Sequence, residues 1–243
     1  FAGRLPLQNR AAWDIMNRRA VIDGGKEIFC MTRFIFVRHG QSVGNLTGRF
    51  LGQYDGALTD LGRRQAERAA EFLRDERIDE AFASDLSRAY ETGKIIAEPH
   101  GIIPVPDKAL REISAGKWEN EEFSKIEEIY GADFGVWQND IMNARPTGGE
   151  SVRELAERVT KEVWRLAALC DSKTVLVATH ATPIRMLLRE WVNIGALPDG
   201  PKWVSNASST TAVYDAGRHT VEVIKVSENS YLSGVETDLP PNV

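Results

Sequence analysis

The stretch FIFVRHGQSVGN, residues 34–45, carries an apolar run that ends abruptly on an arginine and a histidine. Its first four residues, Phe34 to Val37, suit a strand that is covered on both faces of a sheet. Gly40 then permits a tight turn that other residues resist. Because open α/β sheets place their sites beyond the carboxyl ends of the strands, we expect Arg38 and His39 to lie in a functional site.

Strand-like and helix-like patterns alternate along the rest of the chain. Thr59 predicts the start of one helix, Ser84 or Asp85 the start of a second, and Thr182-Pro183 the start of another. Ser151-x-x-Glu154 is a capping box that opens a further helix. The predicted strands are Arg33–Val37, Ile78–Ala83, Val175–Ala178 and an antiparallel pair, Thr211–Tyr214 with Val221–Val226. Strands that alternate with helices indicate an α/β fold, a mostly parallel sheet with helices on both faces.

Composition and charge exclude several other classes of protein. The chain has 243 residues, enough for one good-sized α/β core, and a formal net charge of −5 that provides no basic stripe for nucleic acid. No apolar run approaches the roughly 20 residues of a membrane span. Two cysteines, Cys30 and Cys170, are too few for a disulfide framework, so we expect a reducing, cytoplasmic setting.

Residues 1–30 differ from the rest of the chain, with scattered arginines, no sustained periodicity and a Gly24-Gly25 break. They also lack the continuous apolar stretch of a secretory signal. We interpret them as an N-terminal extension outside the core, followed by one domain over residues 31–243. The competing interpretation is a short helix from Ala11 to Arg19.

Polar residues gather at the predicted strand ends. Arg38 and His39 follow the first strand, Arg88 lies in the first turn of the helix after the second, and His180 follows the strand that ends near Ala178. Two arginines, two histidines and helix N-termini make a pocket that suits a phosphate dianion.

A metal site is the alternative for these residues, because His39, His180 and Glu112 are all potential ligands. Each of them alone is more often a satisfied polar residue. Two adjacent arginines would repel a divalent cation, and the spacing expected of a zinc site is absent. The occurrence of these residues together with two arginines therefore favours a phosphate site over a metal site.

The ordered motifs resemble those of the histidine phosphatase superfamily, also called phosphoglycerate-mutase-like, over Met31–Val226. They are Arg38-His39-Gly40-Gln41-Ser42-x-x-Asn45, Gly52–Gly62, Ser84-x-x-x-Arg88-Ala89-x-x-Thr92, Leu110-Arg111-Glu112-Ile113, Gly148-Gly149-Glu150-Ser151 and Thr179-His180. The resemblance implies a three-layer α/β/α sandwich with the site at the carboxyl ends of the strands. The chain departs from the family where Ala181-Thr182-Pro183 replaces a common glycine, which predicts a narrower pocket there.

The resemblance also implies the role of each residue, with no metal and no cofactor. A neutral imidazole can attack phosphorus at pH 7, since its reference pKa is about 6.5 and nearby arginines lower it. The implied roles are His39 as the nucleophile that forms a phosphohistidine, Glu112 as proton donor and then base, Arg38, Arg88 and His180 as phosphate-binding cationic groups, and Asn45 with the Ala181 N–H as further phosphate donors.

The segment Ile113–Thr147 bears on the choice between phosphatase and mutase. It is short for a mutase, and its cations, Lys117, Lys125 and Arg145, are outnumbered by carboxylates. We therefore expect a phosphatase that acts on small phosphorylated metabolites, with a phosphoglycerate mutase and a non-catalytic phospho-ligand binding protein as alternatives. Its aromatic residues are interpreted as a lid's own core rather than a substrate wall; they are Trp118, Phe123, Tyr130, Phe134 and Trp137.

Overall fold

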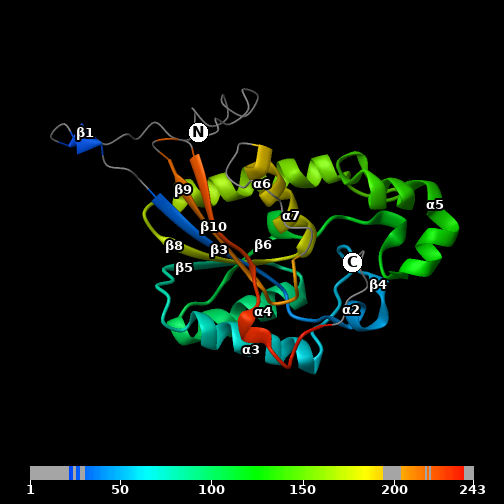
Figure 1. Ribbon diagram of the computed structural model, residues 1–243, viewed down its shortest axis with the longest axis horizontal. Coiled ribbons are helices and arrows are strands. Elements are labelled where there is room, and N and C mark those ends of the chain that lie inside the picture. Colours follow the sequence, from blue (N-terminus) through cyan, green and yellow to red (C-terminus); the bar gives the residue numbers. More distant parts are fainter. Residues whose placement is uncertain are drawn as a thin grey trace.

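A six-stranded sheet forms the centre of the computed structural model, which describes residues 22–23, 26–27, 31–193, 204–216, 218 and 220–237 (Figure 1). Its strand order is β10 (Thr220–Glu228), β9 (Ser209–Asp215), β3 (Met31–Arg38), β8 (Thr174–Thr179), β5 (Glu80–Ser84) and β6 (Val105–Asp107). Strands β3, β8, β5 and β6 are parallel, whereas β9 and β10 are antiparallel to their neighbours. The predicted mostly parallel sheet and the antiparallel pair at its edge are thus confirmed.

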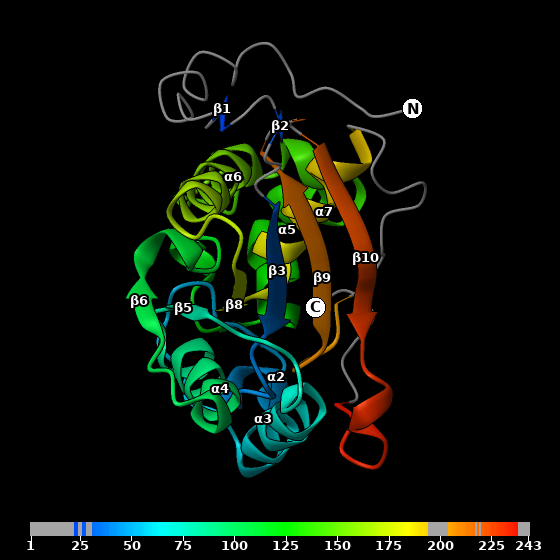
Figure 2. The same ribbon diagram turned by 90° about the vertical axis from the view of Figure 1, so that its left-hand side faces the viewer.

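Helices cover both faces of this sheet (Figure 2). Helices α3 (Asp60–Leu73) and α4 (Ser87–Ala97) lie on one face, and α6 (Val152–Leu169) and α7 (Ala181–Asn193) lie on the other. On β3, Ile35 and Val37 pack in the core beneath α3 and α4, whereas Phe34 and Phe36 pack in the core beneath α6 and α7. Burial on both faces explains why this strand is continuously apolar rather than alternating.

The structure confirms two of the predicted helix caps and contradicts a third. Thr59 accepts a hydrogen bond from the N–H of Gly62 at 3.0 Å, and Ser151 forms the predicted capping box, so both predictions are confirmed. The prediction that Ser84 or Asp85 caps α4 is wrong, because the cap residue is Leu86 and has no side-chain hydrogen bond.

A carboxylate from another part of the chain takes over that capping role. Asp55 accepts from both the backbone N–H and the hydroxyl of Ser87, each at 2.7 Å. Because Asp55 caps the helix, Ser84 and Asp85 make other contacts, and the contact of Ser84 belongs to the site.

Helix α5 (Phe123–Asn139) belongs to a segment for which the sequence predicted no element. It follows strand β7 (Glu121–Glu122), which pairs with β4 (Arg49–Phe50), and β4 comes directly after the short helix α2 (Val43–Thr47). The remaining short 3-10 turns are Glu98–His100, Lys108–Leu110, Gly116–Trp118, Ile141–Asn143 and Ser230–Leu232.

At the N-terminal end, the structure describes only strands β1 (Ile22–Asp23) and β2 (Lys26–Glu27), which pair with each other and not with the central sheet. The alternative helix from Ala11 to Arg19 lies outside the described residues, and the extension itself stays a prediction. No helix in the described part of the chain is long and apolar enough to span a membrane.

Candidate active site

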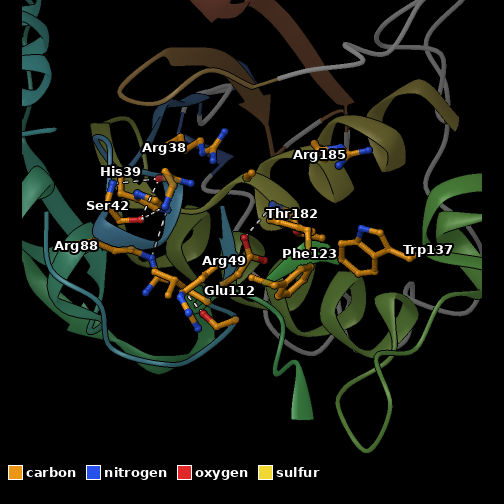
Figure 3. A pocket seen from close by; sticks show the side chains of 15 residues that line it. Arg38, His39, Ser42, Arg49, Arg88, Glu112, Phe123, Trp137, Thr182 and Arg185 are labelled. Carbon is orange, nitrogen blue, oxygen red and sulfur yellow. Dashed lines mark hydrogen bonds between the residues drawn. The ribbon is translucent and has the colours of Figure 1, made fainter. Parts of the chain in front are cut away.

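The predicted site residues converge at the carboxyl ends of the parallel strands. A cleft of about 570 Å³, counting its open mouth, is lined by all of them except His180, namely Arg38, His39, Asn45, Arg88, Glu112 and Ala181 (Figure 3). His180 is fully buried directly behind the cleft, where its ring meets that of His39 edge-on with centroids 5.1 Å apart. The strand ends thus bring together residues from four distant parts of the sequence.

The hydrogen bonds of His39 determine which of its nitrogens is nucleophilic. Nδ1 lies 2.7 Å from the carbonyl oxygen of Gly40, and because a carbonyl only accepts, Nδ1 carries the proton. Nε2 accepts a hydrogen bond from Nε of Arg88 at 3.3 Å and therefore holds the lone pair. Burial, assisted by the charges of Arg88 and Arg38, lowers the pKa of His39 well below its ordinary value. The ring is therefore neutral at neutral pH, with Nε2 available to attack phosphorus.

Arg38 and Arg88 supply positive charge beside that nitrogen. Both are almost fully buried, and Arg88 donates to the carbonyl oxygens of Gly52 at 2.7 Å and Tyr54 at 3.0 Å. Arg38 donates to the carbonyl oxygen of Val204 at 2.6 Å. Burial lowers the pKa of each arginine to about 10, which leaves both charged at neutral pH. Two rigidly held guanidinium groups suit the non-bridging oxygens of a phosphate.

Glu112 is held on the cleft by backbone groups from two segments. One carboxylate oxygen accepts the N–H of Ile113 at 2.8 Å, and the other accepts the N–H of Thr182, at the start of α7, at 3.3 Å. The backbone carbonyl of Glu112 receives hydrogen bonds from Gln53 at 3.1 Å and Arg158 at 3.4 Å. A carboxyl fixed in this way beside a neutral imidazole can exchange a proton with a leaving oxygen or with water.

Comparison with known proteins agrees with this geometry. The sequence model of the histidine phosphatase superfamily (branch 1) matches residues 34–227. The chain belongs to the histidine phosphatase superfamily. The family name that the motifs suggested is therefore confirmed.

Named relatives of this histidine phosphatase include both mutase-like proteins and phosphatases. It is 35% identical over 189 residues to phosphoglycerate mutase-like protein 4 of Arabidopsis thaliana, covering 70% of this chain and 81% of that protein. It is 31% identical over 157 residues to phosphoserine phosphatase 1 of Hydrogenobacter thermophilus, covering 65% of this chain and 74% of the relative. Among solved structures, it resembles mycobacterial glucosyl-3-phosphoglycerate phosphatase with a TM-score of 0.70 and 29% identity, covering 82% of this chain and 99% of the other. The similarity supports phosphatase action on small phosphorylated metabolites.

Ser84, at the end of β5, is a part of the site that the sequence assigned to helix capping instead. Its hydroxyl oxygen lies 2.8 Å from Nε2 of His180 and accepts the N–H of Leu86 at 3.3 Å. Burial lowers the pKa of His180 well below its ordinary value, so the ring carries one proton at neutral pH and is not the cationic group that the resemblance implied. Nδ1 of His180 is buried and has no hydrogen-bond partner among the residues that the structure describes. When the Ser84 hydroxyl donates to Nε2, the proton of His180 sits on Nδ1.

Asn45 is oriented by a capping box at the start of α2. Its side-chain oxygen accepts from the N–H and the hydroxyl of Ser42, both at 3.0 Å, and from Asn206 at 3.1 Å. Because these contacts engage the side-chain oxygen, the NH₂ group of Asn45 is the part of the amide left to donate to a ligand in the cleft that this residue lines. Asn206, which also donates to the carbonyl oxygen of His39 at 3.0 Å, had no motif that pointed to it.

Other residues of the cleft had no predicted catalytic or phosphate-binding role; they are Ser42, Arg49, Phe50, Leu51, Gly52, Phe123, Trp137, Thr182 and Arg185. The interpretation of the aromatic residues as a lid core is only partly right. Trp118, Phe134 and Trp137 are buried in that core and Phe123 packs against it, but Phe123 and Trp137 also line the cleft together with Phe50.

Arg185 could have been found from its spacing. It lies four residues after Ala181 in α7, so it shares a helix face with a predicted site residue. Within the described ranges, no group of three or more His, Cys, Asp or Glu side chains could hold a metal ion.

Proposed function

We propose that this histidine phosphatase hydrolyses small phosphomonoesters through a phosphohistidine formed at Nε2 of His39. The observation that carries the proposal is the hydrogen-bonded state of His39, whose Nδ1 donates to Gly40 and whose Nε2 lone pair faces the arginines. A neutral nucleophile beside two guanidinium groups is the arrangement that phosphoryl transfer to a side chain needs.

In the first chemical step, the Nε2–P bond forms while the bond from phosphorus to the ester oxygen breaks. Arg38 and Arg88 bind the non-bridging oxygens and stabilise their charge in the transition state. His180 and Asn45 donate further hydrogen bonds to the same phosphoryl group. Glu112 gives its proton to the departing oxygen and becomes a carboxylate.

In the second step, water attacks phosphorus and the Nε2–P bond breaks. The Glu112 carboxylate takes a proton from that water, which restores the acid for the next cycle. Inorganic phosphate leaves, and His39 returns to its neutral state. No step requires a metal ion or cofactor.

A mutase is the second candidate, since phosphoglycerate mutase-like protein 4 is 35% identical to this chain and a solved phosphoglycerate mutase of Bacillus anthracis has the same fold. The middle segment favours hydrolysis, because none of its three cations lines the cleft. Lys117 and Lys125 are exposed, and Arg145 pairs with Glu154 at 2.9 Å on the surface.

The deciding experiment compares p-nitrophenyl phosphate with 3-phosphoglycerate, with chelator present and no metal added. Phosphate release from p-nitrophenyl phosphate without isomerisation of 3-phosphoglycerate supports the phosphatase. Net isomerisation of 3-phosphoglycerate would support the mutase, and no turnover of either would support a phospho-ligand binding protein. A strict need for a divalent metal would contradict the mechanism given above.

We further propose that the protein works in the cytoplasm. The chain has only two cysteines, and Cys170 is a buried thiol outside any disulfide, which suits a reducing compartment. Fractionation of the source cells with an antibody against the protein tests this location.

A further inference from the structure

Gln65 is a polar side chain in the protein interior that the chemistry above does not use. It lies on α3 and is fully buried. Its Oε1 accepts the backbone N–H of Gln41 at 2.7 Å, and its Nε2 donates to the carbonyl oxygen of Val235 at 2.7 Å and to the hydroxyl of Thr237 at 2.8 Å. Because a backbone N–H only donates and a carbonyl oxygen only accepts, these partners leave a single orientation for the Gln65 amide.

The N–H that Gln65 binds belongs to the same peptide group as the carbonyl oxygen that orients His39. The carbonyl oxygen of Gly40 accepts Nδ1–H of His39 at 2.7 Å, and the N–H of Gln41 lies on the other edge of that planar unit. A rotation of the unit would move both groups together. The contact with Gln65 therefore fixes the direction of the acceptor that keeps the proton on Nδ1 and the lone pair on Nε2.

The peptide group before Gly40 is anchored by other residues. Its carbonyl oxygen, on His39, accepts the side chain of Asn206 at 3.0 Å, and its N–H, on Gly40, donates to the hydroxyl of Thr92 at 3.1 Å. Both peptide groups beside Gly40 are thus hydrogen-bonded through N–H and C=O. The second group reaches the rest of the molecule through Gln65.

The segment of residues 230–237, which follows β10, holds the other end of the Gln65 amide. Tyr231 of this segment stacks on Phe72 of α3, with ring centroids 4.4 Å apart, and donates its hydroxyl to the carbonyl oxygen of Ala207 at 2.7 Å. The segment is thereby fixed against α3. Its two acceptors for Gln65 prevent the amide from turning away from the nucleophile.

We propose that Gln65 is a positioning residue that holds His39 in its reactive tautomer through the peptide group between Gly40 and Gln41. This inference rests on the proposed role of His39 as the nucleophile. A hydrogen bond to the peptide N–H polarises the group and strengthens its carbonyl oxygen as an acceptor for Nδ1–H. The reactive nitrogen of an imidazole is set by the hydrogen bond that the other nitrogen makes, and Gln65 supports that bond from one step further away.

Vanadate and phosphate provide a test that separates positioning from folding. Vanadate forms a bond to Nε2 of His39, whereas phosphate is held through the arginines. Gln65→Met keeps the length of the side chain but leaves the buried N–H of Gln41 without its acceptor. Because a buried hydrogen bond contributes up to about 10-fold, we expect the ratio of vanadate affinity to phosphate affinity to fall by about that factor, and kcat for p-nitrophenyl phosphate to fall with it.

Gln65→Glu is the conservative variant, since it keeps an oxygen that can accept the N–H of Gln41, and its ratio should stay near the wild-type value. The matched control is Thr32→Val, which removes buried hydrogen bonds to the carbonyl oxygens of Ala167 and Cys170 at the opposite end of β3. It should lower stability without changing the ratio. An unchanged ratio in Gln65→Met, or an equal loss of both affinities, would overturn the proposal.

Nitrogen NMR of the labelled resting protein tests the tautomer directly and needs no turnover. Signals that disappear in His39→Ala belong to His39, and in the wild type they should show the proton on Nδ1. Gln65→Met should show a mixture of the two tautomers, and so should Gln65→Asn, whose shorter amide cannot span both partners, if the first variant does not fold. A proton on Nε2 in the wild type, or the wild-type spectrum in these variants, would contradict the proposal even if the enzyme is active. Turnover of p-nitrophenyl phosphate by the wild type tests the phosphatase function separately.

Discussion

The backbone of Gly40 packs directly against that of Gly62, at the start of α3. A Cβ atom on Gly40 would overlap the carbonyl oxygen of Gly62, and a Cβ on Gly62 would overlap the carbonyl oxygen of Gln41. Gly40 is outside the left-handed region of backbone conformation. The glycine after His39 is therefore required by close approach of two backbones, which brings α3 against the turn that presents the nucleophile.

We expect Gly40→Ala to reduce both stability and activity. Overpacking typically costs about 1–3 kcal/mol, and here the clash is with backbone atoms that cannot rotate away. The turn must therefore shift and carry the ring of His39 with it. Urea unfolding and phosphatase kinetics measure the two effects. Gly131→Ala is the control, since a Cβ at Gly131 in α5 meets nothing within 4 Å, and a loss of comparable size there would contradict the packing argument.

The central sheet could be predicted because its signals are local. Arg33–Val37 and Val175–Ala178 are apolar at every core position, and both lie in strands that helices cover on each face. Capping residues also act within a few positions, so Thr59 and Ser151 marked their helices correctly. The start of α4 was missed because its capping carboxylate, Asp55, comes from 32 residues away.

The site was predictable only where a motif marked it. His39, Arg88 and Glu112 stood at strand ends or in family motifs, and the structure brings them to one cleft. The role of Ser84 depends on its contact with His180, 96 residues away, which no local pattern shows. Arg185 stands in no motif, and its spacing of four residues after Ala181 on α7 was the one signal that could have pointed to the cleft.

We expect His39→Ala to lose nearly all turnover while it still binds inorganic phosphate through Arg38 and Arg88. In the wild type, a rapidly quenched reaction should carry phosphate on the protein in an acid-labile, base-stable bond. Vanadate, which mimics the five-coordinate transition state, should inhibit. Mass spectrometry of the quenched protein locates the phosphate, and substantial activity in His39→Ala would remove the nucleophile assignment.

Stability should fall as the pH drops below about 6.5. Burial lowers the folded-state pKa of both His39 and His180, so between that pKa and the ordinary value the unfolded chain binds more protons. Each histidine then contributes at most about 1.4 kcal/mol per pH unit to the loss. Urea unfolding at pH 5, 6 and 7 should give a shallower slope for His180→Gln than for the wild type. Equal slopes would mean that His180 is not held neutral in the folded protein.

Glu112→Ala should slow glycerol 3-phosphate far more than p-nitrophenyl phosphate. An alkoxide needs a proton as the P–O bond breaks, whereas p-nitrophenolate barely does, and a general acid contributes about 10²- to 10⁴-fold. Single-turnover phosphorylation of the enzyme by each ester isolates this step from the attack of water. Equal losses for both esters would exclude Glu112 as the proton donor.

Asp85→Asn is the control for that experiment. Arg111 holds Asp85 through two hydrogen bonds of 2.6 and 2.7 Å and keeps the pKa of its carboxyl below the ordinary value, which makes Asp85 a poor proton donor. Any loss in Asp85→Asn should therefore be the same for both esters. A loss confined to glycerol 3-phosphate would transfer the role of acid from Glu112 to Asp85.

We expect Arg158 to hold Glu112 in position although Arg158 does not line the cleft. From α6 it donates to the carbonyl oxygens of Ala109, Arg111 and Glu112, and it pairs with Glu150 at 2.8 Å. It therefore positions the loop that presents the acid.

Arg158→Met keeps most of the apolar stem of the side chain but removes every one of these donors. Because several partly buried acceptors and the Glu150 carboxylate lose their partner, we expect a loss of about 2 kcal/mol in unfolding free energy. Activity should also fall, because the Glu112 carboxyl is displaced. The loss should be larger for glycerol 3-phosphate than for p-nitrophenyl phosphate. Arg153→Met on the same helix is the matched control, since Arg153 is exposed and contacts only Asn143 at 3.0 Å among the hydrogen bonds described. If Arg158→Met loses stability but slows both esters equally, Arg158 supports the fold and not the position of Glu112.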